Sequence, residues 1–160
     1  KQKTAYEIRP RDWSSDVCSS DLEEGLQSPD RPVRFTVQGD GGRLPSTIAT
    51  PLSVVLTELL QNAVDHGFPE GSAGGDVVVV LQNDGDRLGV RVVNDGNGLN
   101  PTFDLGGATG LGLSIVRTLV TTELDGTIEM RAGDPDDFRA VGLGERPKGA
   151  GTVVDLSVPV

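Results

Sequence analysis

The chain has 160 residues, 22 of them glycine and 10 proline, and carries a formal net charge of −10 at pH 7. This length suits one domain with its own core, and the acidic balance argues against DNA or RNA as a ligand, because such binding depends on Lys and Arg side chains that neutralise phosphates. A single cysteine excludes an internal disulfide framework. The sequence shows no signal peptide and no apolar run close to the roughly 20 residues that span a bilayer, so we expect a cytoplasmic domain with no membrane contact.

The first 30 residues differ from the rest of the chain. Residues 11–22, RDWSSDVCSSDL, hold the only Trp and the only Cys, and they resemble a translated sequencing adapter. We therefore interpret residues 1–30 as a partly artefactual segment outside the domain, and we place the domain at residues 31–160. We also expect native upstream sequence to be missing, which re-sequencing of the gene would reveal.

Two elements open the domain. Residues 32–38 (PVRFTVQ) alternate apolar and polar side chains, which is typical of a half-buried strand. After a turn, residues 51–67 (PLSVVLTELLQNAVDHG) repeat apolar side chains at helical spacing. Thr50 can cap this helix, Pro51 suits its first position and Gly67 is a natural stop, so we expect a helix between these limits.

A polar band borders the apolar face of this helix. Positions four and seven or eight apart overlie one another in a helix, which gathers the side chains of Glu58, Asn62, Asp65 and His66. The amide oxygen of Asn62 suits Mg²⁺, and Glu58, one turn earlier, could reach the same volume as a general base. A solvated helix face without a ligand would carry the same residues, so this helix alone does not decide between the two.

Residues 76–82 and 87–94 are expected to form a hairpin. The first run, DVVVVLQ, is β-branched as in a central strand, and the Asn-Asp-Gly-Asp turn at residues 83–86 is a strong hairpin signal. Asp95 follows directly, ahead of glycines at 96 and 98. Held on a rigid strand end, its carboxylate could accept a hydrogen bond from an exocyclic amine, although a simple Asp-Gly turn would look the same.

Residues 99–109 are a flexible, glycine-rich stretch ahead of a helix that we expect over residues 110–121. Gly110 and Gly112 flank Leu111 at its start, so free helix-terminal N–H groups would face whatever lies ahead, and an anion could approach the backbone closely. Glycines at a helix start can equally serve packing, and this alternative stays open.

The C-terminal part is expected to contain strands at residues 127–131 and 153–158. Residues 132–150 between them are polar and rich in Gly, Asp and Pro, which predicts a long loop. The element order β-α-ββ-α-ββ predicts an α+β fold, a two-layer α/β sandwich in which a mixed, mostly antiparallel sheet is covered on one face by helices.

Four motifs follow one another along the chain. They are Glu58-x-x-x-Asn62, Asp95-Gly96-Asn97-Gly98, Gly110-Leu111-Gly112-Leu113 and Gly151-Thr152. Their combination closely resembles the ATP-binding domain of sensor histidine kinases, especially of the actinobacterial type, which shares its fold with DNA gyrase, HSP90 and MutL. The resemblance extends over residues 33–160 and implies the Bergerat-type ATP-binding fold.

The resemblance also implies roles for the motif residues. Glu58 would position or deprotonate the attacking group, and Asn62 would hold Mg²⁺ at the phosphates of ATP. Asp95 would bind the adenine amine, Gly98 would let the backbone pass the base, and Gly96 would belong to the same nucleotide-binding motif. The remaining assignments place Gly110, Leu111 and Gly112 at the phosphates, His66 near them, Thr152 at the adenine pocket and residues 99–109 in the ATP lid.

Some positions depart from the family pattern. Asp65 stands where many members carry Lys or Arg, so a cationic phosphate contact would be missing, and we expect Asp65→Lys to tighten Mg·ATP binding. The lid is short, with Phe103 as its single aromatic residue. His66 is the only histidine, and its place within the nucleotide-binding helix argues against a role as phosphoacceptor.

The resemblance therefore implies the catalytic module of a two-component sensor histidine kinase. It would transfer the γ-phosphoryl of Mg·ATP to a histidine on a missing upstream dimerisation segment of a homodimeric parent, and from there to a response regulator. Two alternatives stay open: a serine kinase of the anti-sigma-factor type, and a regulatory module that binds a nucleotide without transferase activity.

Overall fold

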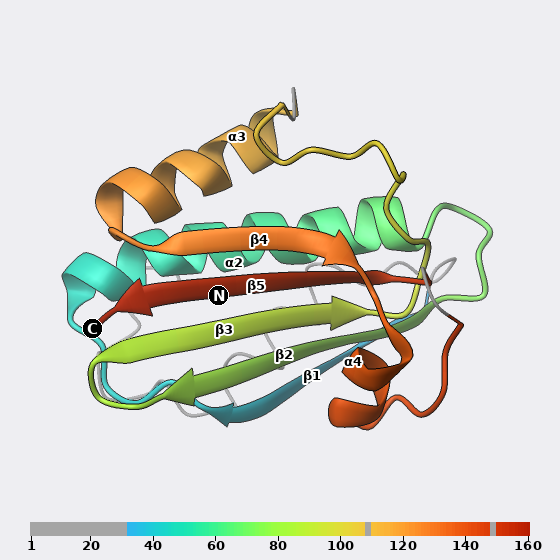
Figure 1. Ribbon diagram of the computed structural model, residues 1–160, viewed down its shortest axis with the longest axis horizontal. Coiled ribbons are helices and arrows are strands. Elements are labelled where there is room, and N and C mark those ends of the chain that lie inside the picture. The colour runs from blue at the N-terminus through green and yellow to red at the C-terminus, as the bar shows by residue number, and fades with distance from the viewer. Residues whose placement is uncertain (1–31, 108–109, 148–149) are drawn as a thin grey trace, which may run out of the picture.

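A computed structural model describes residues 32–107, 110–147 and 150–160 (Figure 1). In chain order its elements are β1 (Val33–Asp40), α2 (Ser46–Gly67), β2 (Gly75–Asn83), β3 (Arg87–Asn94), α3 (Leu111–Thr118), the π-helical turn η2 (Leu119–Glu123), β4 (Thr127–Ala132), α4 (Pro135–Ala140) and β5 (Thr152–Pro159). The predicted N-terminal segment with its adapter-like stretch lies outside the described residues. No helix in the described part of the chain is both long and apolar enough to cross a lipid bilayer.

The strands form one five-stranded sheet in the order β1-β2-β3-β5-β4 (Figure 1). β1 and β2 run parallel because α2 carries the chain back between them, whereas the other neighbouring pairs are antiparallel. β2 and β3 form the predicted hairpin, and the carboxylate of Asp84 in its turn accepts hydrogen bonds from the N–H groups of Asp86 and Arg87. The predicted mixed, mostly antiparallel sheet is confirmed.

α2, α3 and η2 pack on one face of this sheet. Successive strand residues point to opposite faces, so in β3 the side chains of Leu88, Val90 and Val92 face the helices. They join Val55 and Leu59 of α2 in a single buried apolar cluster that also includes residues of α3 and η2. The predicted two-layer α/β sandwich is confirmed.

The start of α2 differs from the prediction. The helix begins at Ser46, with Pro45 at the N-cap, and Pro51 lies inside it. Pro51 lacks the N–H that would bond the carbonyl of Thr47, but Thr47 is exposed, so water can satisfy that carbonyl. The assignment of Thr50 as the cap and Pro51 as the first helical residue is therefore wrong.

The segment predicted as a long loop, residues 132–150, contains the short helix α4. The side chain of Asp137 accepts a hydrogen bond from the backbone N–H of Asp134 at the N-cap, and Pro135 takes the first helical position. Phe138 is fully buried in a second apolar cluster with residues of β2, β3 and β5. These strand residues point away from α2, so α4 covers part of the opposite face, and the loop prediction is wrong for this helix.

Charged side chains form ion pairs on the face of the sheet that α4 partly covers. Arg131 donates hydrogen bonds of 2.7 and 2.8 Å to Asp137, and Arg91 donates one of 2.6 Å to Asp155. The Arg131 hydrogen bonds hold the pKa of Asp137 at about 2, below its ordinary value of 3.8. Because the pKa is lowered in the folded state, the ion pair stabilises the fold above about pH 4, and this contribution is lost as the pH falls toward 2.

We expect Asp137→Asn to lower the free energy of unfolding at pH 7 by about 2 kcal/mol, because the variant cannot form the charged pair. The difference from the wild type should narrow between pH 4 and pH 2, where the wild-type carboxylate becomes protonated. Urea denaturation at stepped pH measures this difference, with Asp136→Asn at an exposed position of α4 as the control. A difference that stays constant down to pH 2 would contradict the role given to the ion pair.

Candidate functional site

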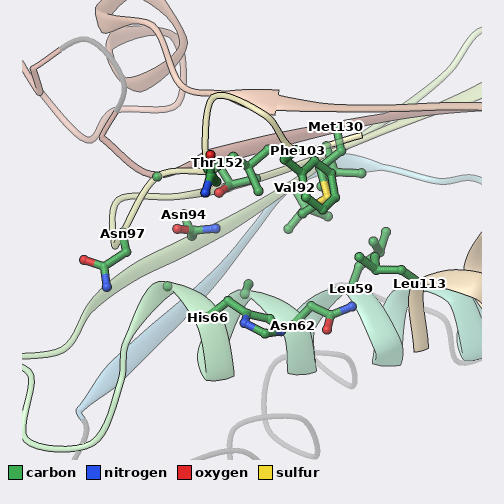
Figure 2. Close-up of a pocket in the computed structure, with 16 residues that line it drawn as sticks. Leu59, Asn62, His66, Val92, Asn94, Asn97, Phe103, Leu113, Met130 and Thr152 are labelled. Carbon is green, nitrogen blue, oxygen red and sulfur yellow. The ribbon is translucent and has the colours of Figure 1, made fainter. Parts of the chain in front are cut away.

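A cavity of about 400 Å³ lies between α2 and the sheet. Figure 2 shows Asn62 and His66 on the helix, facing Asn94 and Thr152 on the sheet side. The residues that line the cavity are Leu59, Asn62, Ala63, His66, Gly67, Val92, Asn94, Asn97, Gly98, Leu99, Asn100, Phe103, Leu113, Met130, Thr152 and Val154. Segments that are far apart in the sequence therefore share one compartment.

The helix wall carries Asn62 and His66 one turn apart. His66 is exposed. The Nδ2 atom of Asn62 is buried and has no hydrogen-bond partner among the described residues. A buried polar group without a partner is energetically costly, which indicates that a bound group completes the site at Asn62.

The first turn of α3 adjoins this helix wall. α3 begins at Leu111 after Gly110, and a Cβ atom on Gly112 would lie 2.6 Å from Oε2 of Glu58 and 3.9 Å from Nδ2 of Asn62. Glycine at 112 thus leaves Glu58 room beside Asn62. Leu111 is 78% exposed, and Glu58, Gly110, Leu111 and Gly112 do not line the cavity itself. Glu58, Asn62 and Gly112 form what we call the acidic corner.

The sheet wall carries two buried polar side chains, Asn94 and Thr152. They are cross-strand partners at the ends of β3 and β5 and are only 4% and 5% exposed. Thr152 was predicted for the site, whereas sequence reasoning missed Asn94. The signal was available, because the alternation of Leu88, Val90 and Val92 along β3 leads to position 94 on the same face.

Asp95 lies outside the cavity. Its Oδ1 atom accepts the backbone N–H of Asp76 at 2.8 Å, and its Oδ2 atom accepts a hydrogen bond from Arg146 at 3.0 Å. The carboxylate is only 7% exposed, so both oxygens are already used within the protein. The structure thus does not place Asp95 where the expected contact with an adenine amine requires it.

Gly96 and Gly98 carry the chain past the end of α2. A Cβ atom on Gly96 would lie 2.2 Å from the carbonyl oxygen of Gly67, so a larger residue would force the backbone apart. The N–H of Asn97 donates to that same carbonyl at 2.8 Å, and the N–H of Gly151 donates to the carbonyl of Gly96 at 2.7 Å. Gly98 lines the cavity. These contacts hold the ends of β3, β5 and α2 together at the cavity edge.

The middle of the cavity is apolar. Val92 and Met130 lie on the sheet side, and Leu113 and Phe103 add apolar surface from α3 and the connecting segment (Figure 2). Val154 of β5 also lines the cavity. Apolar walls with a few buried polar groups are typical of sites that hold a small organic ligand. The cavity therefore suits a flat ring placed between α2 and the sheet.

The segment predicted as a lid, residues 99–109, is described as far as Gly107. Phe103 brings it into the cavity wall. Arg117 of α3 donates a hydrogen bond to the carbonyl of Gly106. The segment is thus connected both to the cavity and to the helix that follows it.

The cavity wall carries little charge. Its lining residues, all from the described part of the chain, include no Asp, Glu, Lys or Arg, and His66 is its ionisable side chain. Asp65 accepts a hydrogen bond of 3.0 Å from Gln61 on the exposed side of α2 and does not line the cavity. The basis for expecting tighter ATP binding by Asp65→Lys is therefore lost.

An anionic ligand in this cavity would need a cation to balance its charge. The described residues contain no group of three or more His, Cys, Asp or Glu that could hold a metal ion. The Nδ2 atom of Asn62, which has no partner among the described residues, is a donor and suits a phosphate oxygen, while the same amide carries one oxygen that can bind a cation. This suits Mg²⁺, which is usually held by one or two protein ligands together with substrate phosphates and water.

Comparison with known protein families gives one match over most of the chain. The family described as histidine kinase-, DNA gyrase B-, and HSP90-like ATPase matches residues 47–160. The sensor histidine kinase PdtaS of Mycobacterium tuberculosis is 47% identical over 106 residues, which are 66% of this chain and 21% of PdtaS. PdtaS of Mycolicibacterium smegmatis is 41% identical over 128 residues, 78% of this chain and 26% of that protein. The chain thus spans only 21% to 26% of the length of these relatives.

Solved structures show a similar arrangement. The histidine kinase domain of the Erythrobacter litoralis blue-light activated histidine kinase has a TM-score of 0.69 and 26% identity, over 90% of this chain and 58% of that one. The mycobacterial sensor histidine kinase MprB has a TM-score of 0.56 at 22% identity, over 90% of each chain, which is a likeness of fold.

Proposed function

Because the chain belongs to the histidine kinase-, DNA gyrase B- and HSP90-like ATPase family, we propose that it is the ATP-binding catalytic module of a two-component sensor histidine kinase. In this proposal it transfers the γ-phosphoryl group of Mg·ATP to a histidine on an upstream dimerisation segment of a homodimeric parent. A response regulator then receives the phosphoryl group. One observation carries the proposal. The cavity has the neutral polar side chains of Asn94 and Thr152 at its sheet end, and the acidic corner adjoins its other end.

The adenine ring is proposed to lie between Val92, Met130 and Val154 on one side and α2 on the other. Its polar edge meets Asn94 and Thr152, which are buried at the sheet end of the cavity. We assign the base contact to Asn94 in place of Asp95 because the carboxylate of Asp95 is already bonded to Asp76 and Arg146. The phosphates then extend along α2 toward the first turn of α3.

At the phosphate end, Asn62 is proposed to hold Mg²⁺ through its amide oxygen, with His66 near the phosphates. When bound, Mg²⁺ neutralises phosphate charge that the cavity wall does not offset with Lys or Arg. The first turn of α3, with Gly110, Leu111 and Gly112, supplies backbone N–H groups that favour an anion.

Glu58 is proposed as the catalytic base. As the bond between the acceptor nitrogen and the γ-phosphorus forms, the bond from that phosphorus to the β–γ bridging oxygen breaks and ADP leaves. The imidazole gives up its N–H proton, and the carboxylate of Glu58 accepts it. Its position beside Asn62 and Gly112 supports this role, and positioning of the reactants supplies much of the remaining catalysis.

Calorimetric titration of the whole chain with ATP in the presence of Mg²⁺ tests the binding part of this proposal. We expect saturable binding with one nucleotide per chain and competition by ADP. The absence of any nucleotide binding by correctly folded protein would overturn it.

Gly112→Ala should reduce phosphoryl transfer by about tenfold without lowering the melting temperature. The added methyl group would lie 2.6 Å from Oε2 of Glu58, and the flexible end of that side chain can move away at little cost to stability. A displaced catalytic group, however, loses much of its rate advantage. Transfer kinetics and thermal melting together measure the effect, and Gly89→Ala in β3, where a Cβ atom would meet nothing closer than 3.7 Å, is the control for activity and stability. Unchanged transfer in Gly112→Ala would argue against a close approach of Glu58 to this turn.

The uncharged cavity wall also favours a second candidate, a module that binds the nucleotide without transferring phosphate. In that case ATP would bind, but no acceptor would be phosphorylated. The serine kinase alternative predicts phosphoserine in place of phosphohistidine. The chemical nature of the product therefore separates all three candidates.

A further inference from the structure

We propose that the base-binding end of this cavity accepts 6-oxopurine nucleotides as well as adenine nucleotides, and that Asn94 is the residue that sets this tolerance. The inference rests on the proposed function, because it takes the cavity to be the nucleotide site. It concerns whether the protein donates a hydrogen bond to position 6 of the purine or accepts one from it. Adenine carries a donating amine at this position, whereas hypoxanthine and guanine carry an accepting oxygen.

The first step is the identity of the buried polar groups. Asn94 and Thr152 are paired across β3 and β5 and are 4% and 5% exposed, and both line the cavity (Figure 2). An amide has a donating and an accepting end, and a hydroxyl both donates and accepts. The carboxylate that could only accept, that of Asp95, is outside the cavity.

The second step is the orientation of the Asn94 amide. The backbone N–H of Gly96 donates to its Oδ1 atom at 3.2 Å, and Nδ2 has no acceptor among the described residues. In this orientation Nδ2 donates toward a ligand, which suits a 6-oxo group or a ring nitrogen. Rotation of the amide by 180° would present Oδ1 to the adenine amine, but it would break the bond from Gly96 and turn Nδ2 toward that N–H; without rotation, Nδ2 can still donate to a ring nitrogen of adenine.

The third step is the rest of the wall. Valine, leucine, methionine and phenylalanine side chains line the middle of the cavity, and they do not distinguish an amine from a carbonyl oxygen. Asn97 and Asn100 also line the cavity, and their amides can either donate or accept. The described lining residues include no carboxylate, which could only accept a hydrogen bond from the base, and no Lys or Arg, which could only donate one. A carboxylate at position 94, by contrast, would attract the adenine amine and repel a 6-oxo group.

Titration of the whole chain with Mg·ATP and Mg·ITP tests the inference. ITP differs from ATP at position 6 and in the proton on N1, so it isolates the group that Asn94 would contact. For the wild type we expect the two dissociation constants to agree within about tenfold. For Asn94→Asp we expect the preference for ATP over ITP to rise by at least about tenfold, since a buried group left with a mismatched partner discriminates strongly. Asp95→Asn, the reverse exchange at the neighbouring position, is the matched control and should leave the ratio unchanged.

The outcomes separate the two claims. If the wild type binds ATP but binds ITP more than about tenfold more weakly, the inference is overturned and the nucleotide site stands. If neither nucleotide binds, the proposed function fails. Should Asn94→Asp not fold, Asn94→Ser replaces it: both affinities should then fall by a similar factor, and unchanged affinities would remove Asn94 from the base contact. A ratio that responds to Asp95→Asn would assign the contact to Asp95.

Discussion

Glu58→Gln is expected to bind Mg·ATP almost as well as the wild type but to transfer its phosphoryl group about 10²–10⁴-fold more slowly. The substitution keeps the size and helix propensity of the side chain and removes its ability to accept a proton. Glu58 adjoins Asn62 and Gly112 but does not line the cavity, so its loss should affect kcat far more than nucleotide affinity. Transfer of label from [γ-³²P]ATP to a supplied acceptor domain, measured with ATP titrations, gives both quantities.

The matched control for this prediction is Glu129→Gln. Glu129 is exposed on β4, and its side chain points to the face of the sheet opposite the cavity, so the exchange removes the same charge at a distance. We expect wild-type transfer for this variant. Equal rates for the wild type and Glu58→Gln would make Glu58 a structural acid of α2.

Removal of divalent cations is expected to weaken ATP binding by about 10²-fold. Polyphosphate carries several negative charges, the chain itself is strongly acidic, and the described cavity wall offers no Lys or Arg. A unit charge pair at 4 Å contributes about 4 kcal/mol at an effective dielectric of 20, part of which is offset by desolvation. Calorimetric titration with EDTA against excess Mg²⁺ measures the change.

Asn62→Ala tests whether that cation dependence passes through this residue. Without the amide oxygen, the affinity in Mg²⁺ should fall toward the value in EDTA, so that the two conditions differ little. Adenosine, which has no phosphates, is the control ligand and should bind the wild type equally with or without Mg²⁺. ATP affinity that is indifferent to EDTA would contradict a metal ion held at Asn62.

The sheet and its helices were predictable because their patterns are local. Period-two alternation fixed both strands of the β2–β3 hairpin, and helical spacing identified the cavity face of α2 with Asn62 and His66. The same alternation, extended past Val92, places position 94 rather than 95 toward the helices. The carboxylate of Asp95, next to two glycines, is conspicuous in the sequence, but the periodicity of β3 does not direct it toward the cavity, and the structure shows it bonded elsewhere.

The sequence of α4 also carried a usable signal. Asp134-Pro135 followed by Asp137 is an N-terminal helix pattern, but the surrounding glycines and acids obscured it. The start of α2 was harder to predict, because Pro45 and Pro51 both suit a first turn. Pro51 can lie inside the helix because Thr47, whose carbonyl loses its partner, is exposed to water.

Other parts of the site depend on contacts between distant segments. Met130 and Val154 reach the cavity only because β5 lies between β3 and β4. Arg146 pairs with Asp95 across 51 positions of sequence. No local pattern announces such a partner, so the engagement of Asp95 outside the cavity follows from the tertiary fold alone.

Phosphoryl transfer to a separately supplied histidine is the measurement that tests the central claim most directly. The chain is mixed with [γ-³²P]Mg·ATP and a dimerisation domain of a sensor histidine kinase that carries an acceptor His. The account predicts label on that domain in an acid-labile, base-stable linkage, as expected of phosphohistidine, and its loss in Glu58→Gln. Saturable ATP binding without label on any acceptor, or label in an acid-stable phosphoserine, would contradict it.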